Sequence, residues 1–269
     1  MTDLRLAVTG AAGRMGKTLV EGIAQAPDLA LGAAFEQAGT EAVGKDAGEL
    51  AGTGHLGVAI TDAVVEQTDQ FDVVIDFTVP GATLELARHC RQAGKPMVVG
   101  TTGFSESELA ELKEAQADIA LFMAPNMSIG VNLVFKLIED AARVLGDSAD
   151  VEVLEAHHRH KIDAPSGTAV RMGEVLAETL GRDLATDAIY GRQGITGERN
   201  RATIGFSTMR GGDIVGEHTV MFACEGERIE ITHRAQSRMN FAQGALRAAR
   251  FVVDQPPGIY DMQTLLGFS

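Results

Sequence analysis

Short apolar runs separated by stretches with helical spacing dominate the first half of the chain. Leu19, Ile23 and Ala24 give that spacing after the first run, and a second helix is expected over about 106–117. The apolar runs are short and most end at glycine, proline or polar residues, which predicts strands at 4–8, 29–35, 73–77, 97–100 and 119–123. Short apolar strands alternating with helices are typical of an α/β protein whose parallel sheet is covered on both faces.

The pattern changes after Asn126, where a second domain of α+β type is expected to begin. We predict helices over about 129–145 and 168–180, with a strand at 151–156 between them. Strands then follow at 203–208, 214–224 and 228–233, and glycine-containing turns between them favour a mostly antiparallel set. A last helix over about 241–253 is expected to pack on the first domain. The predicted domains are therefore 1–127 with 239–269, and 128–238.

Composition and charge limit the classes of function that the chain can have. The chain has 269 residues, 45% of them hydrophobic, and a formal net charge of −14, which favours a globular protein and opposes binding to nucleic acid or anionic lipid. Cys90 and Cys224 cannot form a disulfide framework, so a reducing compartment is expected. No signal peptide or membrane-spanning run is evident, which predicts a cytoplasmic location. An anionic ligand would need locally gathered cations.

A glycine turn joins the first strand to the first helix. Its G-x-x-G-x-x-G spacing, with Gly at 10, 13 and 16, lets the backbone approach a pyrophosphate at a helix N-terminus. Glu36 ends the next strand, where an acid can accept hydrogen bonds from an adenosine ribose. A tight turn without a ligand is the alternative. The candidate cofactor residues are Gly10, Ala11, Ala12, Gly13, Arg14, Met15, Gly16, Glu36 and the adjacent Gln37.

Three later loops also follow predicted parallel strands. Ligands of open parallel sheets lie beyond the carboxyl ends of the strands, so these loops are expected to reach the second half of the cofactor. Ordinary turn chemistry is the alternative for each loop, because Gly, Pro, Asn and Thr favour turns. The candidates are Phe77, Gly100, Thr101, Thr102, Ala124, Pro125, Asn126 and Met127.

The densest basic cluster runs from His157 to Lys161 and is followed by Ser166, Gly167 and Thr168 at a predicted helix start. Charged donors beside a helix N-terminus predict a carboxylate site, and histidine can exchange a proton near neutral pH. A helix cap at Ser166 or Thr168, a solvated basic edge and a metal site are the alternatives. We expect no metal, because strand alternation sends neighbouring histidines to opposite faces. His55, His89, His218 and His233 lack comparable neighbours in the sequence and are expected to be structural or on the surface.

The motifs Gly10–Gly16, Gly100–Gly103, Ala124–Asn126, Glu155–Thr168 and Gly212–His218 together resemble those of 4-hydroxy-tetrahydrodipicolinate reductase, over nearly the whole chain. The resemblance implies a Rossmann-like domain that binds NADH or NADPH, an open mixed sheet in the second domain, a homotetramer, and hinge closure. It implies a dicarboxylate substrate that is reduced with loss of water in lysine and diaminopimelate biosynthesis. It also implies that His157 and Lys161 transfer protons, and that His158, Ser166, Gly167 and Thr168 bind the substrate.

The chain departs from the family at Gln37, where relatives that favour NADPH carry arginine. An uncharged residue beside Glu36 predicts that NADH is used at least as well as NADPH, and Lys45 is the next candidate cation. Met127 replaces an aromatic residue of some relatives. Two other functions are considered: another two-domain NAD(P)-dependent dehydrogenase, and a dinucleotide sensor without catalytic activity.

Overall fold

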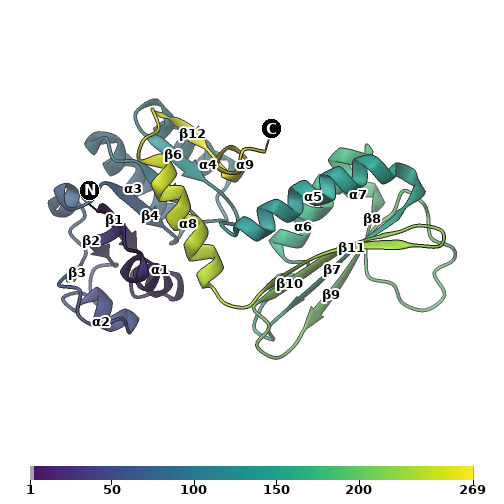
Figure 1. The fold of residues 1–269 in the computed structure, drawn as a ribbon, viewed down its shortest axis with the longest axis horizontal. Coiled ribbons are helices and arrows are strands. Elements are labelled where there is room, and N and C mark those ends of the chain that lie inside the picture. Colours follow the sequence, from purple (N-terminus) through teal and green to yellow (C-terminus); the bar gives the residue numbers. More distant parts are fainter. Residues whose placement is uncertain (1–2, 269) are drawn as a thin grey trace. The chain divides into compact units, whose positions relative to one another are not determined.

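The computed structural model describes residues 3–268. The chain forms two compact units, which are described separately: unit 1 is Met1–Ile129 with Arg238–Ser269, and unit 2 is Gly130–Ser237. Both have α/β character, and unit 1 contains a parallel sheet of Rossmann type, as predicted (Figure 1). Among the described residues no helix combines the length and apolar character needed to cross a membrane.

A seven-stranded parallel sheet forms the centre of unit 1, in the order β12-β6-β5-β4-β1-β2-β3. Its strands are β1 Leu4–Thr9, β2 Leu29–Phe35, β3 Ile60–Thr61, β4 Val73–Asp76, β5 Met97–Val99, β6 Ala120–Met123 and β12 Gly258–Tyr260. The helices are α1 Arg14–Gln25, α2 Ala47–Ala51, α3 Pro80–Ala93, α4 Glu106–Lys113, α8 Met239–Val252 and α9 Met262–Leu266, with 3-10 helices at Val65–Gln70 and Glu114–Ala117. The strand order reverses between β1 and β4, which is where open parallel sheets bind ligands.

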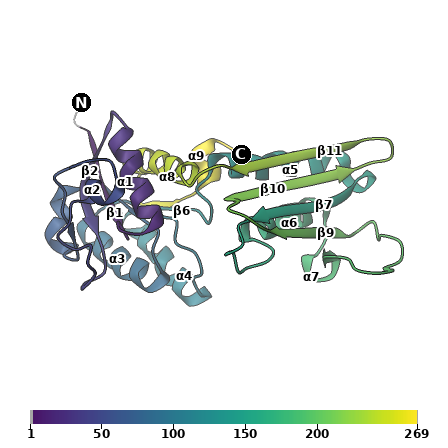
Figure 2. The ribbon, with the colours of Figure 1, turned by 90° about the horizontal axis from the view of Figure 1, so that it is seen from below.

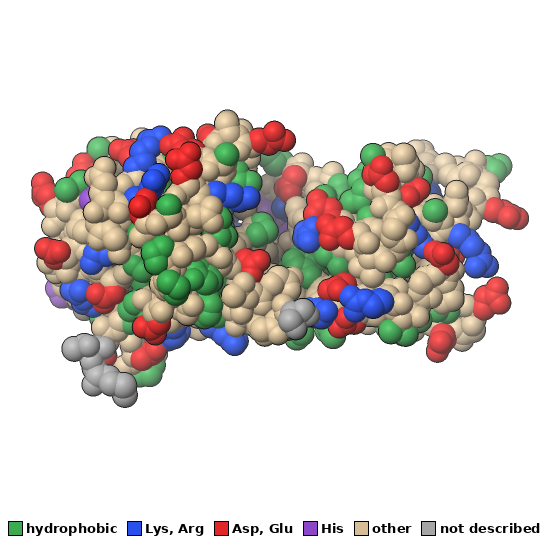
Figure 3. Space-filling model, turned by 90° about the horizontal axis from the view of Figure 1, so that it is seen from above, with side chains coloured by type: hydrophobic (Ala, Val, Ile, Leu, Met, Phe, Trp, Pro, Cys, Tyr) green, Lys and Arg blue, Asp and Glu red, His purple; other side chains and the backbone are tan. Residues whose placement is uncertain are grey.

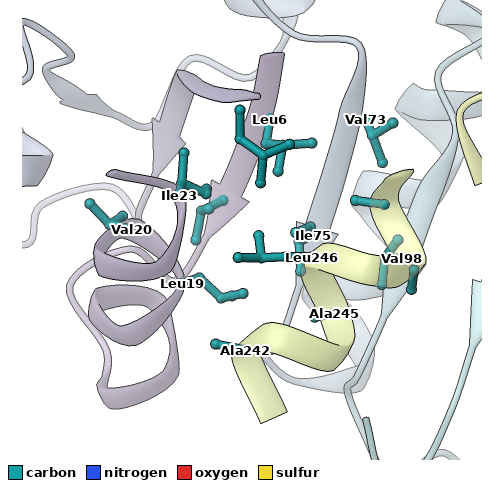
Figure 4. Close-up of a cluster of buried hydrophobic side chains, with 14 of the residues drawn as sticks. Leu6, Leu19, Val20, Ile23, Val73, Ile75, Val98, Ala242, Ala245 and Leu246 are labelled. Carbon is teal, nitrogen blue, oxygen red and sulfur yellow. The ribbon is translucent and has the colours of Figure 1, made fainter. Parts of the chain in front are cut away.

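Helices cover both faces of this sheet. α1 and α8 lie on one face, where Leu19, Ile23 and Leu246 pack against Leu6 and other side chains of the central strands (Figure 4). α3 and α4 lie on the other face, over a second apolar cluster. The alanines of α8 allow close approach to the sheet, so this segment from the end of the chain completes the core of unit 1.

Local sequence explains where the helix predicted over 106–117 begins, and the structure shows how it ends. Ser105 accepts a hydrogen bond from the Glu108 N–H, and the Glu108 side chain accepts one from the Ser105 N–H, which forms a capping box. The predicted helix over 106–117 is α-helical only as far as Lys113 and tightens into a 3-10 turn from Glu114. Such tightening is common at the ends of α-helices.

Unit 2 contains a five-stranded mixed sheet in the order β11-β10-β7-β9-β8. Its strands are β7 Asp150–His157, β8 Ala188–Tyr190, β9 Ile204–Arg210, β10 Gly216–Ala223 and β11 Arg228–Ala235, and its helices are α5 Ile129–Leu145, α6 Gly167–Leu180 and α7 Leu184–Asp187, with a 3-10 turn at Gly146–Ser148. The expectation that 203–208 belongs to an antiparallel set is wrong. β9 runs parallel to both β7 and β8, because β7 lies between β9 and β10 and is antiparallel only to β10.

Among the described residues, helices cover one face of this sheet and leave the other uncovered. α5 and α6 lie behind β7, β9 and β10 in Figure 2, and their apolar side chains pack against Val153, Phe206 and Val220. Strand alternation places Glu155 and His157 on the same covered face as Val153, whereas Glu152 and Leu154 point to the opposite face. On the molecular surface that is visible in Figure 3, Lys and Arg side chains lie among Asp and Glu side chains.

Candidate functional site

The glycine turn of unit 1 leaves room for a ligand at the start of α1. Gly10 has φ +60°, a conformation that favours glycine, and a Cβ on Gly16 would stand 2.1 Å from the Gly10 carbonyl oxygen. The backbone can therefore make this close turn only with glycine at Gly16. Gly13 is the N-cap of α1, and no side chain within residues 3–268 caps this helix, so its first N–H groups are available to an anion. This turn fits the pyrophosphate of a dinucleotide.

Glu36 is held at the same turn. Its Oε1 accepts a hydrogen bond from the Ala12 N–H at 3.1 Å, and its Oε2 accepts one from the Gln37 N–H at 3.0 Å. The carboxylate is thus fixed beside the glycine turn by two backbone donors. Each oxygen still has a lone pair that can accept a ribose hydroxyl proton. The Gln37 side chain beside it is exposed and uncharged.

A buried carboxylate that the sequence reasoning missed ties the next two loops together. Asp76 ends β4, is 1% exposed, and accepts hydrogen bonds from the hydroxyls of Thr9, Thr78, Thr83 and Thr101 at 2.5–2.8 Å. Thr101 also accepts the Thr78 N–H at 2.9 Å. The network therefore joins the carboxyl ends of β1, β4 and β5, the edge where the cofactor is expected.

The other predicted cofactor residues differ in exposure. Arg14, Thr102 and Pro125 are exposed, while the side chains of Ala11 and Ala124 belong to the hydrophobic core. Phe77 packs against Gly100, where a Cβ would stand 2.2 Å from its ring. Met15 and Asn126 are half-buried, and the Asn126 side chain accepts the Ser128 N–H.

Met127 does not offer its side chain to a ligand. It is 1% exposed and packs in the core beside α8, and its carbonyl group lies against Gly244. At this position we therefore expect a ligand to contact the backbone and not the side chain. The side chain is drawn inward because it is apolar and the chain turns there from β6 toward α5.

In unit 2, the predicted acid–base histidine lies at the end of β7 against a carboxylate. His157 Nδ1 is 2.6 Å from Oε2 of Glu155, and both side chains are nearly buried. Arg210 on β9 donates to both oxygens of Glu155, at 2.7 and 2.8 Å. Glu155 also accepts the Ser166 N–H at 3.0 Å and the Thr208 hydroxyl at 3.3 Å. No other hydrogen bond reaches the His157 ring within residues 3–268, so its Nε2 is free.

These contacts determine the charges of Glu155 and His157. Burial alone would raise the pKa of Glu155, but hydrogen bonds from Arg210 and His157 hold its pKa at about 2. Burial lowers the pKa of His157, and Glu155 opposes this shift while Lys161 and Arg210 add to it. At neutral pH the site therefore contains an ionised carboxylate beside a neutral histidine that can gain a proton.

His218, which was expected to be structural or on the surface, is buried beside the predicted acid–base histidine. Antiparallel pairing of β10 with β7 places it opposite Glu155, and its ring lies edge-on to His157 with the centroids 5.1 Å apart. Its Nε2 is 2.8 Å from the Ser166 hydroxyl. Burial, with repulsion from His157, lowers the pKa of His218 to about 3. Strand pairing across more than 50 positions brings the two rings together, so the motif that ends at His218 did not by itself reveal this neighbour.

Ser166 is the N-cap of α6, the alternative considered for it, and its hydroxyl accepts the Ala169 N–H at 3.2 Å. Gly167 beside it is exposed, and a Cβ there would meet no atom within 4 Å. His158 Nδ1 is shielded from solvent and has no hydrogen-bond partner in the described part of the chain. Lys161 forms an ion pair with Asp163 at 2.9 Å. The end of β7 and the start of α6 are thus linked through Glu155, and Thr168 lies in the first turn of the helix.

Across residues 3–268, no group of three or more His, Cys, Asp and Glu side chains is arranged to hold a metal ion. The predicted proton-transfer and carboxylate-binding residues of unit 2 do lie around one strand end and one helix start. His160 and Arg159 are exposed at the outside of this loop. The arrangement suits proton transfer beside a bound anion, without a metal ligand set.

The fold is shared with solved oxidoreductases. A dipicolinate-bound dihydrodipicolinate reductase from Paenisporosarcina sp. TG-14 superimposes with a TM-score of 0.76 at 23% identity, over 98% of this chain and 99% of that one. An amine dehydrogenase from Mycobacterium smegmatis gives 0.63 at 16% identity, over 98% and 95%. The diaminopimelate (DAP) dehydrogenase of C. glutamicum, solved with DAP, gives 0.54 at 13%, over 97% and 93%.

Family comparison covers almost the whole chain. Residues 4–127 match the family described as dihydrodipicolinate reductase, N-terminus, and residues 130–266 match dihydrodipicolinate reductase, C-terminus. The two matches meet near the boundary between the two compact units. The chain therefore belongs to the dihydrodipicolinate reductase family, NAD(P)H-dependent oxidoreductases of lysine and diaminopimelate biosynthesis.

Proposed function

We propose that unit 2 binds 4-hydroxy-tetrahydrodipicolinate, the substrate of this family's reduction, at the N-terminus of α6. The observation that carries the proposal is the free Nε2 of His157, whose ring is linked through Glu155 to the helix start at Ser166 and the exposed Gly167. The N–H groups of a helix start favour a carboxylate. His158 supports this assignment, because its shielded Nδ1 has no partner among residues 3–268 and could donate to a second carboxylate oxygen.

The similar reductase from Paenisporosarcina was solved with dipicolinate, a dicarboxylate on a planar ring. A ring of this kind needs donors for two carboxylates. In this chain we assign them to His158, Ser166, Gly167 and Thr168. Ser166 contributes mainly through the cap that sets the direction of the first N–H groups of α6, because its hydroxyl is already bonded to His218 and Ala169.

Proton transfer is assigned to His157 and Lys161. The bound cofactor supplies the hydride for the reduction, and the accompanying loss of the 4-hydroxyl as water needs a positioned acid. His157 can hold or release a proton at Nε2, since Nδ1 is engaged by Glu155. Lys161 can provide a proton from its ammonium group once a substrate carboxylate competes with Asp163 for it.

For the cofactor, we assign the pyrophosphate to the turn of residues 10–16 and the adenosine ribose to Glu36. The uncapped start of α1 and the two backbone N–H groups that orient Glu36 support this assignment. The loops at Phe77, Gly100–Thr102 and 124–127 are assigned to the nicotinamide half. Their position beyond the carboxyl ends of neighbouring parallel strands supports this choice.

We further propose that the protein acts in the cytoplasm as a homotetramer. The uncovered face of the unit 2 sheet supports self-association, because it exposes apolar side chains such as Leu154 and Met209. Light scattering of the purified protein would test the number of subunits. A monomer at micromolar concentration would contradict the proposal.

The function is tested by following the loss of reduced-cofactor absorbance while a synthase condenses pyruvate with aspartate semialdehyde to supply the substrate. Oxidation by the wild type is expected, with a loss of about 100-fold or more in His157→Ala and Lys161→Ala. His160→Ala is the matched control from the same loop and should stay near wild type. Turnover of a different substrate would favour another dehydrogenase. Cofactor binding without any turnover would favour a sensor.

A further inference from the structure

We propose that Glu155 is a positioning residue: one buried carboxylate fixes the proton on Nδ1 of His157 and holds that ring in register with the start of α6. The inference rests on the proposed function of His157 as the proton-transfer group. It adds a residue that touches neither substrate nor cofactor and acts through its neighbours. Glu155 lies two residues before His157 on β7, and strand alternation brings both side chains to one face.

The two oxygens of Glu155 serve different partners. Oε2 contacts His157 Nδ1 at 2.6 Å, while Oε1 accepts the Ser166 N–H at 3.0 Å. The carboxylate therefore spans the distance between the proton-transfer ring and the N-cap of the helix that we assign to the substrate. A displacement of one partner would be passed to the other through a single rigid planar group.

The ionisation of Glu155 determines the tautomer of His157. Arg210 donates to both oxygens, and this fork stabilises the charge of a side chain that is only 4% exposed. An ionised carboxylate can only accept hydrogen bonds, so the short contact requires a proton on Nδ1 of His157. Nε2 of the neutral ring then carries the lone pair and is the atom that gains and loses the proton.

Several charged or titratable groups face His157. Glu155 lies on the same strand, Arg210 on β9, and His218 on β10, while Lys161 with its partner Asp163 lies in the following loop. Glu155 favours the charged form of His157, whereas Arg210 and Lys161 oppose it. Removal of Glu155 or of Arg210 should therefore move the pKa of His157 in opposite directions.

The test uses the intact enzyme in which histidine Cε1 and Cδ2 carry ¹³C in a deuterated background. The His157 signal is assigned by its absence in His157→Gln, and its titration and tautomer are read without substrate or cofactor. In Glu155→Gln we expect a lower His157 pKa and partial loss of the Nδ1–H tautomer, since a glutamine amide can also donate. In Arg210→Met we expect a higher His157 pKa, because Glu155 keeps its charge through its other donors.

Glu152→Gln is the matched control. Glu152 lies on the same strand and also binds two arginines, Arg192 and Arg199, but points to the opposite face of the sheet. Its loss should leave the His157 titration and tautomer unchanged. A change in that control equal to the change in Glu155→Gln would contradict a specific role for Glu155.

Activity gives a separate readout. We expect Glu155→Gln to lower kcat by about 10- to 100-fold with a smaller change in KM, because glutamine can still accept the Ser166 N–H. The limb of the pH–rate profile that reports His157 should move to lower pH. If the wild type reduced no substrate, the proposed function would fail while the resonance measurement still tested Glu155.

An unchanged His157 pKa and tautomer in Glu155→Gln, with only a lower melting temperature, would overturn the proposal and leave Glu155 a purely structural residue. Should Glu155→Gln fail to fold, Arg210→Met decides the question. A His157 proton that stays on Nδ1 in that variant supports an ionised Glu155 as the group that fixes the tautomer, because loss of the Arg210 charge raises the His157 pKa in any case. A proton on Nε2 in that variant overturns the proposal.

Discussion

Gly216 lies directly beside His157: a Cβ at position 216 would stand 3.0 Å from Nε2 of the histidine. That distance is shorter than an ordinary carbon–nitrogen contact, so the ring would have to shift. Because Nδ1 is held by Glu155, a shift would misplace the proton-transfer atom. We expect Gly216→Ala to lower kcat by roughly tenfold or more, equivalent to about 1.4 kcal/mol.

Steady-state kinetics checks this prediction, with Gly211→Ala as the control. Gly211 lies in the loop between β9 and β10 that leads to Gly216, and a Cβ there would meet no atom within 4 Å. The control should keep wild-type kcat. Equal losses in both variants would show that this segment responds to any alanine and that contact with His157 is not the cause.

Ser166→Ala should reduce both stability and activity. It removes the cap of α6 and the partner of His218, so we expect a loss of about 1 kcal/mol in the free energy of unfolding of unit 2. Ser105→Ala removes a comparable cap from α4 and is the control. Urea unfolding and kcat/KM should show two destabilised variants of which only Ser166→Ala is catalytically impaired. Full activity in Ser166→Ala would argue against a substrate site at this helix start.

Acid should destabilise the fold through His218 first. Burial lowers its pKa from 6.5 to about 3, so between these values the unfolded chain binds a proton that the folded chain does not. Stability falls with falling pH wherever the unfolded state binds more protons, here by at most about 1.4 kcal/mol per pH unit. Urea unfolding between pH 7 and pH 5 should show the loss, and His218→Gln should reduce its slope. A slope equal to that of wild type would contradict the prediction.

Glu155 should add a second loss at lower pH. Its pKa is about 2 in the folded chain and 4.5 ordinarily, so its contribution is complete above about pH 4.5 and disappears as the pH falls toward 2. The same linkage applies, because the unfolded carboxyl takes up its proton first. Urea unfolding of Glu155→Gln below pH 4.5 should show a shallower dependence than wild type. If stability fell with pH equally in both proteins, a group other than Glu155 would be responsible for the loss.

Asp76→Asn should weaken cofactor binding. An amide cannot accept from four threonine hydroxyls, so we expect a loss of roughly 1–3 kcal/mol in the free energy of unfolding and a several-fold higher KM for the reduced cofactor. Asp72→Asn is the control, since Asp72 precedes the same strand at its other end and pairs with Arg5. It should lose stability without a change in that KM. An equal rise in both variants would refute a local role for Asp76.

The preference for NADH or NADPH should depend on the residue at position 37. We expect kcat/KM with NADH to equal or exceed that with NADPH, and Gln37→Arg to raise the value for NADPH by about tenfold, because a charge-assisted hydrogen bond contributes roughly 1.5–3 kcal/mol. Parallel assays of both cofactors measure this. Lys45→Ala is the companion variant, because Lys45 is exposed on the same segment. If its loss abolished NADPH use, Lys45 would be the residue that holds the 2′-phosphate.

Helix and strand periodicity in the sequence predicted the elements that position the cofactor turn. The strand at 29–35 and the helix at 129–145 have the predicted bounds, and the helix after Ser105 starts at its capping box. Such features depend on neighbours within about one helical turn or on strong local apolarity. The short strand β3 and the final strand β12 were missed, because each has too few residues to show a period.

By itself, then, the sequence determined the element types, the glycine turn and the basic loop, because local propensity and residue chemistry suffice for these. Only the tertiary structure decided that β9 is parallel to β7, that Met127 faces the core, and that His218 and Arg210 surround Glu155 and His157. Arg210 and His218 lie more than 50 positions after Glu155 and His157 in the sequence. They meet through the order and direction of strands, which depend on packing of the whole sheet and not on any short stretch of chain.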